Sequence, residues 1–288
     1  MVPVLRDAWS QITGDIVSQR ATMEALMSVL PLAPGTVTEG VDIGGRPATW
    51  VRPAAERSDG AVIYFHGGAY RQGSPTGYRS FASQLAAATG APYLLLEYRL
   101  APEDPFPAAV DDAVATYREL LDHGVPANRL ALAGDSAGGG LAVATLVAAR
   151  DAGLPQPTGA ALMSPWVDLT VTADSYVRCG PTDPVFGWER AQEAARDYLG
   201  TIDPHHPLAS PLFADLSGIA PLLIHASDAE VLADDATALA TRAEAAGVKV
   251  ELTVAPDMTH VWHAMAPGVP EAREAVAAVA QFLQRAIG

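Results

Sequence analysis

Cysteine is almost absent from this sequence, which has 288 residues and a single cysteine, Cys179. One cysteine cannot form an internal disulfide bond, and no group of histidines and cysteines has the spacing of zinc ligands. No run of about 18 apolar residues suggests a membrane span. The N-terminal segment carries Arg6, Asp7, Asp15 and Arg20 where a secretory signal peptide would be apolar. We therefore expect an unprocessed, soluble protein of the cytoplasm without membrane insertion.

Positive charge is also scarce. The chain has 18 lysines and arginines against 33 aspartates and glutamates, a formal net charge of -15. Such a surface repels a phosphate backbone, so nucleic acid is excluded as a partner. With 49% hydrophobic residues, the chain has enough apolar material for a large core. No repeat or low-complexity linker divides it, so we expect one continuous domain.

Short apolar runs alternate with segments of helical periodicity between residues 61 and 254. This alternation is typical of a mostly parallel sheet covered on both faces. The predicted buried strands are 61–65, 92–96, 130–133, 160–163, 222–224 and 248–254. The predicted helices are 78–89, 108–123, 137–152, 234–246 and 270–287, and a hairpin is expected over 36–41 and 47–52. Two helical stretches, 4–30 and 168–216, lie outside this alternation, and the second is too long for an ordinary connection.

The pentapeptide Gly134-Asp135-Ser136-Ala137-Gly138 lies between a predicted strand and a predicted helix. This is the context of a nucleophile elbow, in which flanking glycines allow a strained turn that exposes the serine. We expect Ser136 to project into solvent as a nucleophile. The alternative is a glycine-rich turn with an ordinary helix-capping serine.

A second glycine-rich segment, His66-Gly67-Gly68-Ala69, directly follows the strand predicted at 61–65. Its backbone N–H groups, together with that of Ala137, are candidate donors to the oxyanion of a tetrahedral intermediate. We expect Gly68 and Ala69 to donate and Gly67 to serve as the hinge of this oxyanion hole. We interpret His66 as fixing the loop rather than as a base.

A serine nucleophile needs a base and an orienting carboxylate, which later strands normally supply. The last predicted strand is followed by His260 and His263, either of which is a candidate base. The strand before it is followed by four carboxylates, Asp228, Glu230, Asp234 and Asp235. We assign Asp234 and Asp235 to the first turn of a helix, where they face its dipole. Glu230 and Asp228 remain as candidate acids.

Five motifs follow one another along the chain: His66-Gly67-Gly68-Ala69, Tyr98-Arg99-Leu100-Ala101-Pro102-Glu103, Phe106-Pro107-Ala108-Ala109, Gly134-Asp135-Ser136-Ala137-Gly138-Gly139 and Ser164-Pro165-Trp166. Together they resemble the bacterial hormone-sensitive lipase family of α/β-hydrolase carboxylesterases. The resemblance implies an eight-stranded α/β fold, no cofactor, and hydrolysis of short to medium acyl esters through an acyl-enzyme. It also implies a helical cap, so we divide the chain into N-terminal cap helices (1–35), a catalytic core (36–167 and 217–288) and a cap insert (168–216).

The resemblance assigns roles to individual residues. Ser136 matches the nucleophile, and His260 matches the base because an aromatic residue, Trp262, follows two positions later. The family's acid segment places the acid at Glu230, with Asp228 as the alternative. The glutamate, which reaches one methylene further, is a departure from the family's usual aspartate. Another departure is Ala69, where many members have a third glycine.

Six aromatic residues are candidate walls of the substrate pocket, although aromatic side chains more often belong to the core: Tyr70, Tyr78, Trp166, Tyr176, Phe186 and Trp188. The pairs His205-His206 and His260-x-x-His263 lack a third ligand, so we expect no metal. Arg71 and Arg79 are candidates for offsetting the negative charge near an anionic substrate. The partner is expected to be a small ester, and the chain a monomer or a homodimer.

Three other functions compete with ester hydrolysis. A lactone hydrolase or a natural-product deacetylase would use the same triad. A ligand-binding pseudo-hydrolase would lack the base, and the presence of His260 argues against it.

Overall fold

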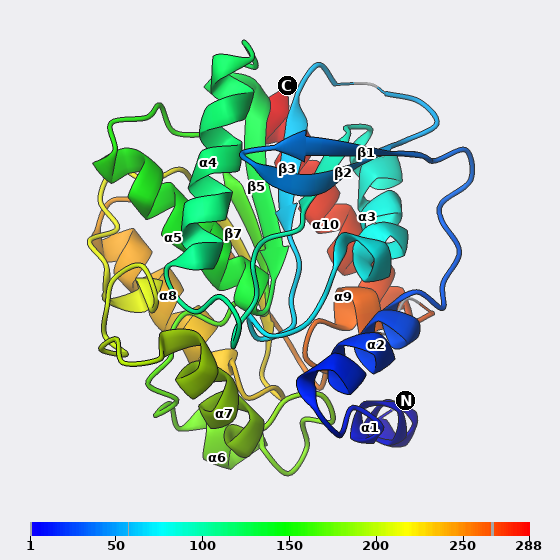
Figure 1. Ribbon diagram of the computed structural model, residues 1–288, viewed down its shortest axis with the longest axis vertical. Coiled ribbons are helices and arrows are strands. Elements are labelled where there is room, and N and C mark those ends of the chain that lie inside the picture. The colour runs from blue at the N-terminus through cyan, green and yellow to red at the C-terminus, as the bar shows by residue number, and fades with distance from the viewer. Residues whose placement is uncertain (1, 57, 266–267) are drawn as a thin grey trace.

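An eight-stranded, mostly parallel β-sheet forms the centre of the molecule (Figure 1). The computed structural model describes residues 2–56, 58–265 and 268–288. The strand order is β1-β2-β4-β3-β5-β6-β7-β8. Strand β2 is antiparallel to β1 and β4, and the pairs from β4 to β8 are parallel. This topology confirms the predicted fold.

The strands agree closely with the apolar runs of the sequence. Their bounds are β1 (Val37–Ile43), β2 (Arg46–Arg52), β3 (Ala61–Phe65), β4 (Tyr93–Leu96), β5 (Leu130–Asp135), β6 (Ala160–Met163), β7 (Leu222–Ser227) and β8 (Val250–Ala255). The first two strands form the predicted hairpin.

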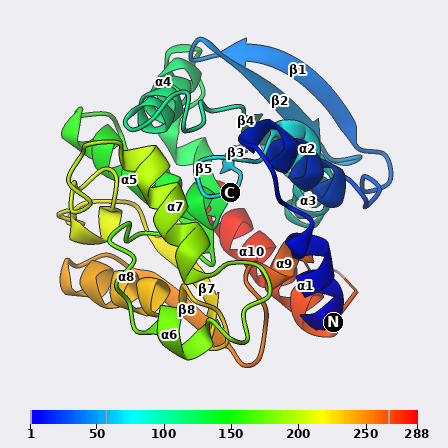
Figure 2. The ribbon, with the colours of Figure 1, turned by 60° about the horizontal axis from the view of Figure 1, so that its bottom comes forward.

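Helices cover both faces of the sheet (Figures 1 and 2). One face carries α4 (Ala108–Asp122), α5 (Ala137–Asp151) and α8 (Ala233–Ala245), and the other carries α3 (Pro75–Thr89) and α10 (Pro270–Ile287). The remaining helices are α1 (Val2–Ser10), α2 (Ile16–Met27), α6 (Ser175–Cys179), α7 (Trp188–Leu199), α9 (Trp262–Met265) and two short 3-10 helices, Ala127–Arg129 and Pro211–Phe213. In the described residues no helix has both the length and the apolar character that crossing a membrane requires.

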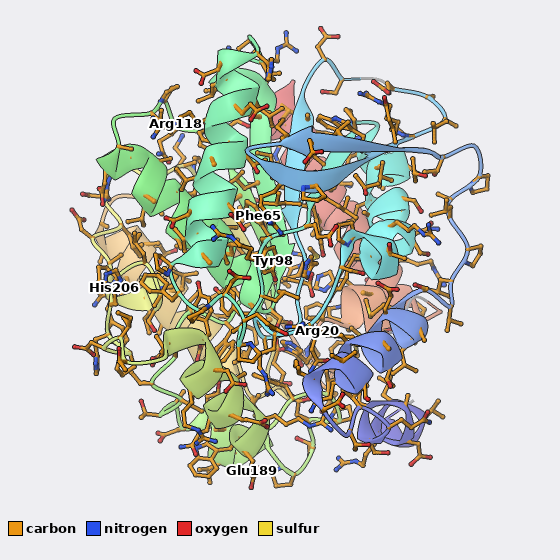
Figure 3. All side chains as sticks on the ribbon, in the orientation of Figure 1. Arg20, Phe65, Tyr98, Arg118, Glu189 and His206 are labelled. Carbon is orange, nitrogen blue, oxygen red and sulfur yellow. The ribbon has the colours of Figure 1, made fainter. Side chains whose placement is uncertain are left out.

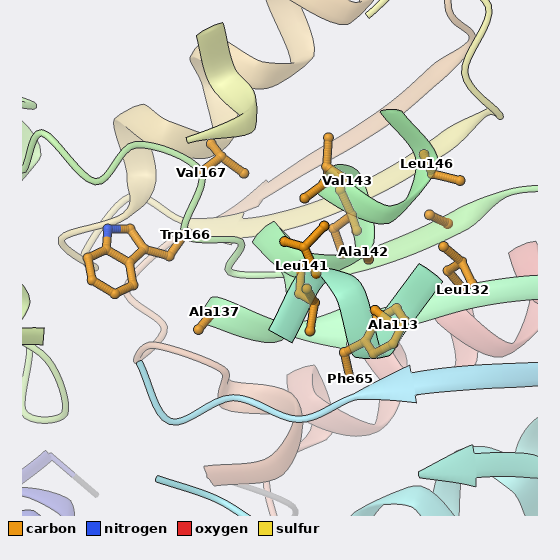
Figure 4. Packing of buried hydrophobic residues seen from close by; sticks show 14 of the residues in the cluster. Phe65, Ala113, Leu132, Ala137, Leu141, Ala142, Val143, Leu146, Trp166 and Val167 are labelled. Atoms are coloured by element: carbon orange, nitrogen blue, oxygen red, sulfur yellow. The ribbon is translucent and has the colours of Figure 1, made fainter. Parts of the chain in front are cut away.

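Each face of the sheet has its own hydrophobic core. Along β3, Ile63 and Phe65 belong to the core beneath α4 and α5, whereas Val62 and Tyr64 belong to the core beneath α3 and α10. This alternation follows from the two-residue period of a strand. Figure 4 shows Phe65 of β3 and Leu141 of α5 among the side chains of the first core. Burying one such side chain contributes about 1.5–3 kcal/mol, so the two cores hold the sheet rigidly between the helix layers.

The N-terminal stretch predicted as helical over 4–30 is divided into α1 and α2. Asp15 accounts for the division, because its side chain caps the start of α2. Arg20 of α2 (labelled in Figure 3) donates hydrogen bonds to the carbonyl oxygens of Arg71 (2.7 Å) and Ala101 (2.9 Å). Through these bonds the N-terminal helices are tied to the loops that follow β3 and β4.

The final strand differs from its prediction. The run 248–254 was expected to be buried, yet β8 is mostly exposed, with Leu252 and Val254 each 40% accessible. Because β8 is the edge strand, it is paired with β7 on one side and open to solvent on the other. An apolar run alone does not distinguish an edge strand from a central one.

The insert 168–216 contains helices α6 and α7, as expected from its length and pattern. Asp234 and Asp235, which the sequence assigned only to a helix dipole, hold this insert in place. Asp235 is buried and accepts hydrogen bonds from the backbone N–H groups of Val167 (3.1 Å) and Asp168 (3.0 Å). Asp234 forms an ion pair at 2.6 Å with an arginine of α6. The two carboxylates therefore link α8 of the core to the insert.

Candidate active site

Ser136 lies at the sharp turn between β5 and α5, with φ 53° and ψ −122°. A positive φ is uncommon for a residue other than glycine, and such strain gathers at functional sites. Gly138 permits the turn, because a Cβ at that position would collide with the carbonyl oxygen of Phe65. The Ser136 side chain makes no capping hydrogen bond to α5, so the capping interpretation is wrong. The serine is only 5% exposed, and it faces a pocket rather than projecting freely into solvent.

Three side chains from distant parts of the sequence form a hydrogen-bonded row. Ser136 Oγ lies 3.0 Å from His260 Nε2, and His260 Nδ1 lies 2.6 Å from Glu230 Oε2. All three residues are buried. With Nδ1 donating to the carboxylate, Nε2 is free to accept the serine proton.

The environment of His260 favours its protonated form. Burial by itself lowers the pKa of the imidazole, but the hydrogen bond and the negative charge of Glu230 outweigh it, with smaller contributions from Asp183 and Asp135. The pKa of His260 is therefore raised above its ordinary value of 6.5. Phe186 stacks against the imidazole, with 5.9 Å between ring centroids, and shields it from water.

The two candidate acids have different surroundings. Glu230 is fully buried, and its second oxygen, Oε1, accepts the N–H of Ser227 at 2.8 Å. Asp228 is exposed, and its Oδ1 accepts the N–H of Asp257 at 2.9 Å. The structure thus brings Glu230 to the histidine and uses Asp228 to hold the turn after β8. The glutamate, longer than the family's usual aspartate, reaches the imidazole.

His263, the alternative base, has a different partner. Its Nε2 lies 3.0 Å from Nδ1 of His225 on β7, and both rings are buried. Burial lowers the pKa of His225 to about 4 and that of His263 well below 6.5. The two histidines form a neutral buried pair between β7 and α9, separate from the contact between Ser136 and His260.

The loop after β3 carries the candidate oxyanion donors. Gly68 has φ 120° and Ala69 has φ 56°, so the backbone turns sharply beside Ser136. Among the described residues, the N–H groups of Gly68 and Ala69 donate to no other protein group. The N–H of Gly67 is already used, because it donates to Asp135 Oδ1 at 3.0 Å. Gly67 therefore anchors the loop and is not a free donor, which corrects its inclusion in the oxyanion hole.

Asp135 connects the elbow to this loop, a role that the sequence did not reveal. Besides the Gly67 N–H, its carboxylate accepts the hydroxyl protons of Tyr64 at 2.6 Å and Tyr78 at 3.0 Å. The three hydrogen bonds lower the pKa of Asp135, but burial outweighs them and raises it to about 6. A Cβ at Gly67 would collide with the Asp135 carboxylate, so the glycine is required for this close approach.

His66 fixes the same loop from its other side. The ring stacks on Tyr98 with 4.3 Å between centroids, and Nδ1 lies 2.8 Å from the carbonyl oxygen of Gly67. Tyr98 also donates its hydroxyl proton to the His66 carbonyl oxygen at 2.7 Å. Burial lowers the pKa of His66 to about 4, so the ring is neutral. These contacts agree with a structural interpretation of His66.

A pocket of about 170 Å³ opens beside Ser136 and His260. Of the six predicted aromatic walls, Tyr78 and Phe186 line it. The prediction was wrong for Tyr70, Trp166, Tyr176 and Trp188. The first three are at most 3% exposed and belong to the core, where Tyr70 stacks on a tyrosine of α7, whereas Trp188 is 44% exposed on the surface of α7.

Both appended segments supply further walls that sequence reasoning missed. Trp9 and Ile12 come from the N-terminal segment, Met23 from α2, and Val185 and Arg190 from the insert. Arg190 joins the two segments, because it donates to the carbonyl oxygen of Trp9 at 3.2 Å. The helical spacing of Ile12 and Met23 was visible in the sequence, but not the pocket that these residues face.

Arg71 lines the pocket without adding net positive charge. It forms ion pairs with Glu193 at 3.0 Å and Asp197 at 2.9 Å, and it is 8% exposed. Two carboxylates therefore neutralise the one guanidinium. The pocket offers an anionic substrate no unpaired cation at this position.

The described residues contain no group of three or more histidine, cysteine, aspartate or glutamate side chains arranged to hold a metal ion. His205 contacts Asp203 at 3.0 Å, and His206 packs against Phe106 with 4.8 Å between ring centroids. The two pairs of histidines noted in the sequence therefore have other contacts.

Known proteins resemble this chain over nearly its whole length. Residues 62–264 match a family model described as alpha/beta hydrolase fold. An acetyl-hydrolase of Streptomyces hygroscopicus is 45% identical over 97% of this chain and 93% of its own length. A crystal structure of an esterase from the bacterial hormone-sensitive lipase family is 44% identical, covers 100% of this chain and 97% of the other, and superposes with a TM-score of 0.97. The structure of EstE5 soaked with p-nitrophenyl butyrate is 42% identical over 99% and 97%, with a TM-score of 0.94.

Proposed function

Since the chain belongs to the bacterial hormone-sensitive lipase family of α/β-hydrolases, we propose that it hydrolyses short to medium acyl esters through an acyl-enzyme formed on Ser136. The observation that carries the proposal is the row of hydrogen bonds from Ser136 through His260 to Glu230, which opens onto a pocket. It is a carboxylic ester hydrolase that uses a serine, a histidine and a glutamate.

In the first half of the reaction, Ser136 Oγ attacks the ester carbonyl carbon while His260 Nε2 accepts its proton. Glu230 stabilises the resulting imidazolium through Nδ1. The tetrahedral intermediate then collapses, the bond between carbon and alkoxy oxygen breaks, and His260 returns the proton to the leaving alcohol. The product is an acyl group bound to Ser136.

In the second half, a water molecule repeats the attack. His260 accepts a proton from the water as its oxygen bonds to the acyl carbon, and Ser136 leaves with that proton. The raised pKa of His260 suits this cycle, because the ring must hold a proton during each tetrahedral intermediate.

The negative oxygen of each intermediate is stabilised by backbone N–H groups of Gly68, Ala69 and Ala137. The free donors on the loop beside Ser136 support this assignment. Asp135 acts as a positioning residue, because it holds Gly67 and thereby the donors that follow it. A donor that is fixed before the reaction costs no reorganisation when charge develops.

The appended helices form a cap over the site. Walls contributed by residues 1–35 and by the insert 168–216 support the division into a cap and a core of 36–167 and 217–288. Their apolar side chains limit the ester to a size that a pocket of about 170 Å³ accepts. The acetyl-hydrolase relative supports acetyl esters as substrates. The cytoplasmic location and the choice between monomer and homodimer stay predictions.

The test is hydrolysis of p-nitrophenyl esters from acetate to dodecanoate by the wild type and by Ser136→Ala. We expect turnover that peaks at short chains and is lost in the variant, with an unchanged circular dichroism spectrum. No turnover by the wild type across the series would overturn the proposal.

A further inference from the structure

A second hollow adjoins the catalytic pocket beneath the N-terminal helices. Its volume is about 190 Å³, and all the described side chains that line it are apolar, among them Leu26, Met27 and Phe81. Its lining residues come from α1, α2, α3 and α9 and from Leu30, and in Figure 2 α2 lies beside α3 and α1 beside α9. None of the catalytic residues lines this hollow, so the reaction described above leaves it without a role.

Two side chains belong to both hollows. Trp9 at the end of α1 and Met265 at the end of α9 line the catalytic pocket on one side and the second hollow on the other. They are therefore the shared wall between the two spaces. Arg190 of the insert donates a hydrogen bond to the carbonyl oxygen of Trp9 at 3.2 Å and so holds the end of α1 in place. Met265 follows His260 closely in sequence, so the wall stands next to the reacting groups.

The chemistry of the hollow selects its occupant. The part of the lining that the structure describes has no charged or polar side chain, so it offers nothing to an anion, a sugar or a peptide backbone. An alkyl chain gains from it, since each methylene moved from water to an apolar site is worth roughly fourfold in affinity. Methionine is the side chain that most readily changes shape to let such a chain pass.

We propose that the second hollow takes the distal end of an alkyl arm of the ester bound at Ser136, and that Trp9 and Met265 set the length of arm that the enzyme accepts. This inference rests on the proposed function. The acyl arm and the alkoxy arm of an ester have the same alkyl chemistry, and the experiment distinguishes them.

The test compares long with short arms in wild type, Trp9→Ala and Met265→Ala. The acyl series compares p-nitrophenyl decanoate with p-nitrophenyl butyrate, and the alkoxy series compares octyl acetate with ethyl acetate. Every substrate is used below the concentration at which it aggregates. Removing either wall side chain should raise the kcat/KM ratio of long to short arm by roughly tenfold or more in one series. Trp188→Ala is the matched control, since Trp188 is an exposed tryptophan on α7 outside both hollows.

A second substitution tests the location. Ala8 lines the second hollow and not the catalytic pocket. Adding Ala8→Phe to Trp9→Ala should therefore fill the second hollow and return the kcat/KM ratio of long to short arm to its wild-type value. The milder Trp9→Phe serves if Trp9→Ala does not fold. Ratios within twofold of wild type in both series, or a gain that survives Ala8→Phe, would overturn this inference. Failure of the proposed function is distinct, because the wild type would then not hydrolyse even the short esters.

Discussion

Replacing Glu230 with glutamine should reverse the arrangement of protons on His260. In the protein, Glu230 Oε1 accepts the Ser227 N–H at 2.8 Å, and Oε2 accepts the His260 Nδ1–H at 2.6 Å. In Glu230→Gln the one amide oxygen is held by the Ser227 N–H, so the NH2 group faces Nδ1. Nδ1 must then accept, the proton moves to Nε2, and Ser136 loses its base.

The expected cost is large. Exchanging the carboxylate of a catalytic triad for an amide lowers kcat by roughly 10⁴-fold through the wrong tautomer, which corresponds to about 5 kcal/mol of lost transition-state stabilisation. The matched control is Asp228→Asn. Its amide oxygen can still accept the N–H of Asp257 on the surface, so kcat should stay within about threefold of wild type.

The assay is steady-state hydrolysis of p-nitrophenyl butyrate, with thermal unfolding followed by circular dichroism to show that each variant is folded. A folded Glu230→Gln that keeps more than a tenth of the wild-type kcat would refute the tautomer argument. A larger loss in Asp228→Asn than in Glu230→Gln would move the acid to Asp228.

Three further predictions concern protons and packing. The kcat/KM for p-nitrophenyl butyrate should rise with pH and reach half its maximum above pH 6.5, because the pKa of His260 is raised above that value and its neutral form is the base; a half-maximum below pH 6 would contradict this. Burial lowers the pKa of His225 and His66 to about 4 and that of His263 below 6.5, so the unfolded state binds more protons at these three rings, and their contribution to stability should fall as the pH drops from 6.5 to 4, by about 3 kcal/mol for His225 alone. Asp135, whose pKa is raised to about 6, opposes this fall in part, because the folded state binds its proton more tightly. Urea unfolding at pH 7 and pH 5 checks this, and equal midpoints would speak against it. Gly138→Ala should lower the free energy of unfolding by about 2 kcal/mol or more, because the added methyl group meets a backbone carbonyl. The control Gly187→Ala, whose methyl group meets nothing within 4 Å, should lower it by less than about 1 kcal/mol. Denaturant midpoints of the two variants check the difference.

Much of the site could be predicted because its motifs are local. The elbow around Ser136 and the loop before Ala69 each join a strand to the next segment, so their position at the same edge of the sheet follows from the parallel topology. Glu230 and His260 follow the last two strands, which brings them to that edge as well.

The parts that the sequence did not predict depend on side-chain direction and on distant packing. Asp135 and Gly67 meet because β3 pairs with β5, so that Phe65 lies opposite Gly134, and no local pattern contains this register. Whether Trp188 lines the pocket depends on how α7 is rotated about its axis over the core. In the structure this rotation exposes the Trp188 side chain to solvent. The pocket wall formed by Trp9 requires α1 to fold back over α9, across almost the whole length of the chain.

The central claim is that Ser136 carries the acyl group, and the most direct measurement is mass spectrometry of the protein quenched in acid during turnover of p-nitrophenyl butyrate. The account predicts a butyryl adduct on the peptide that contains Ser136, and neither adduct nor turnover in Ser136→Ala. An adduct on another residue, or turnover that persists in Ser136→Ala, would contradict it.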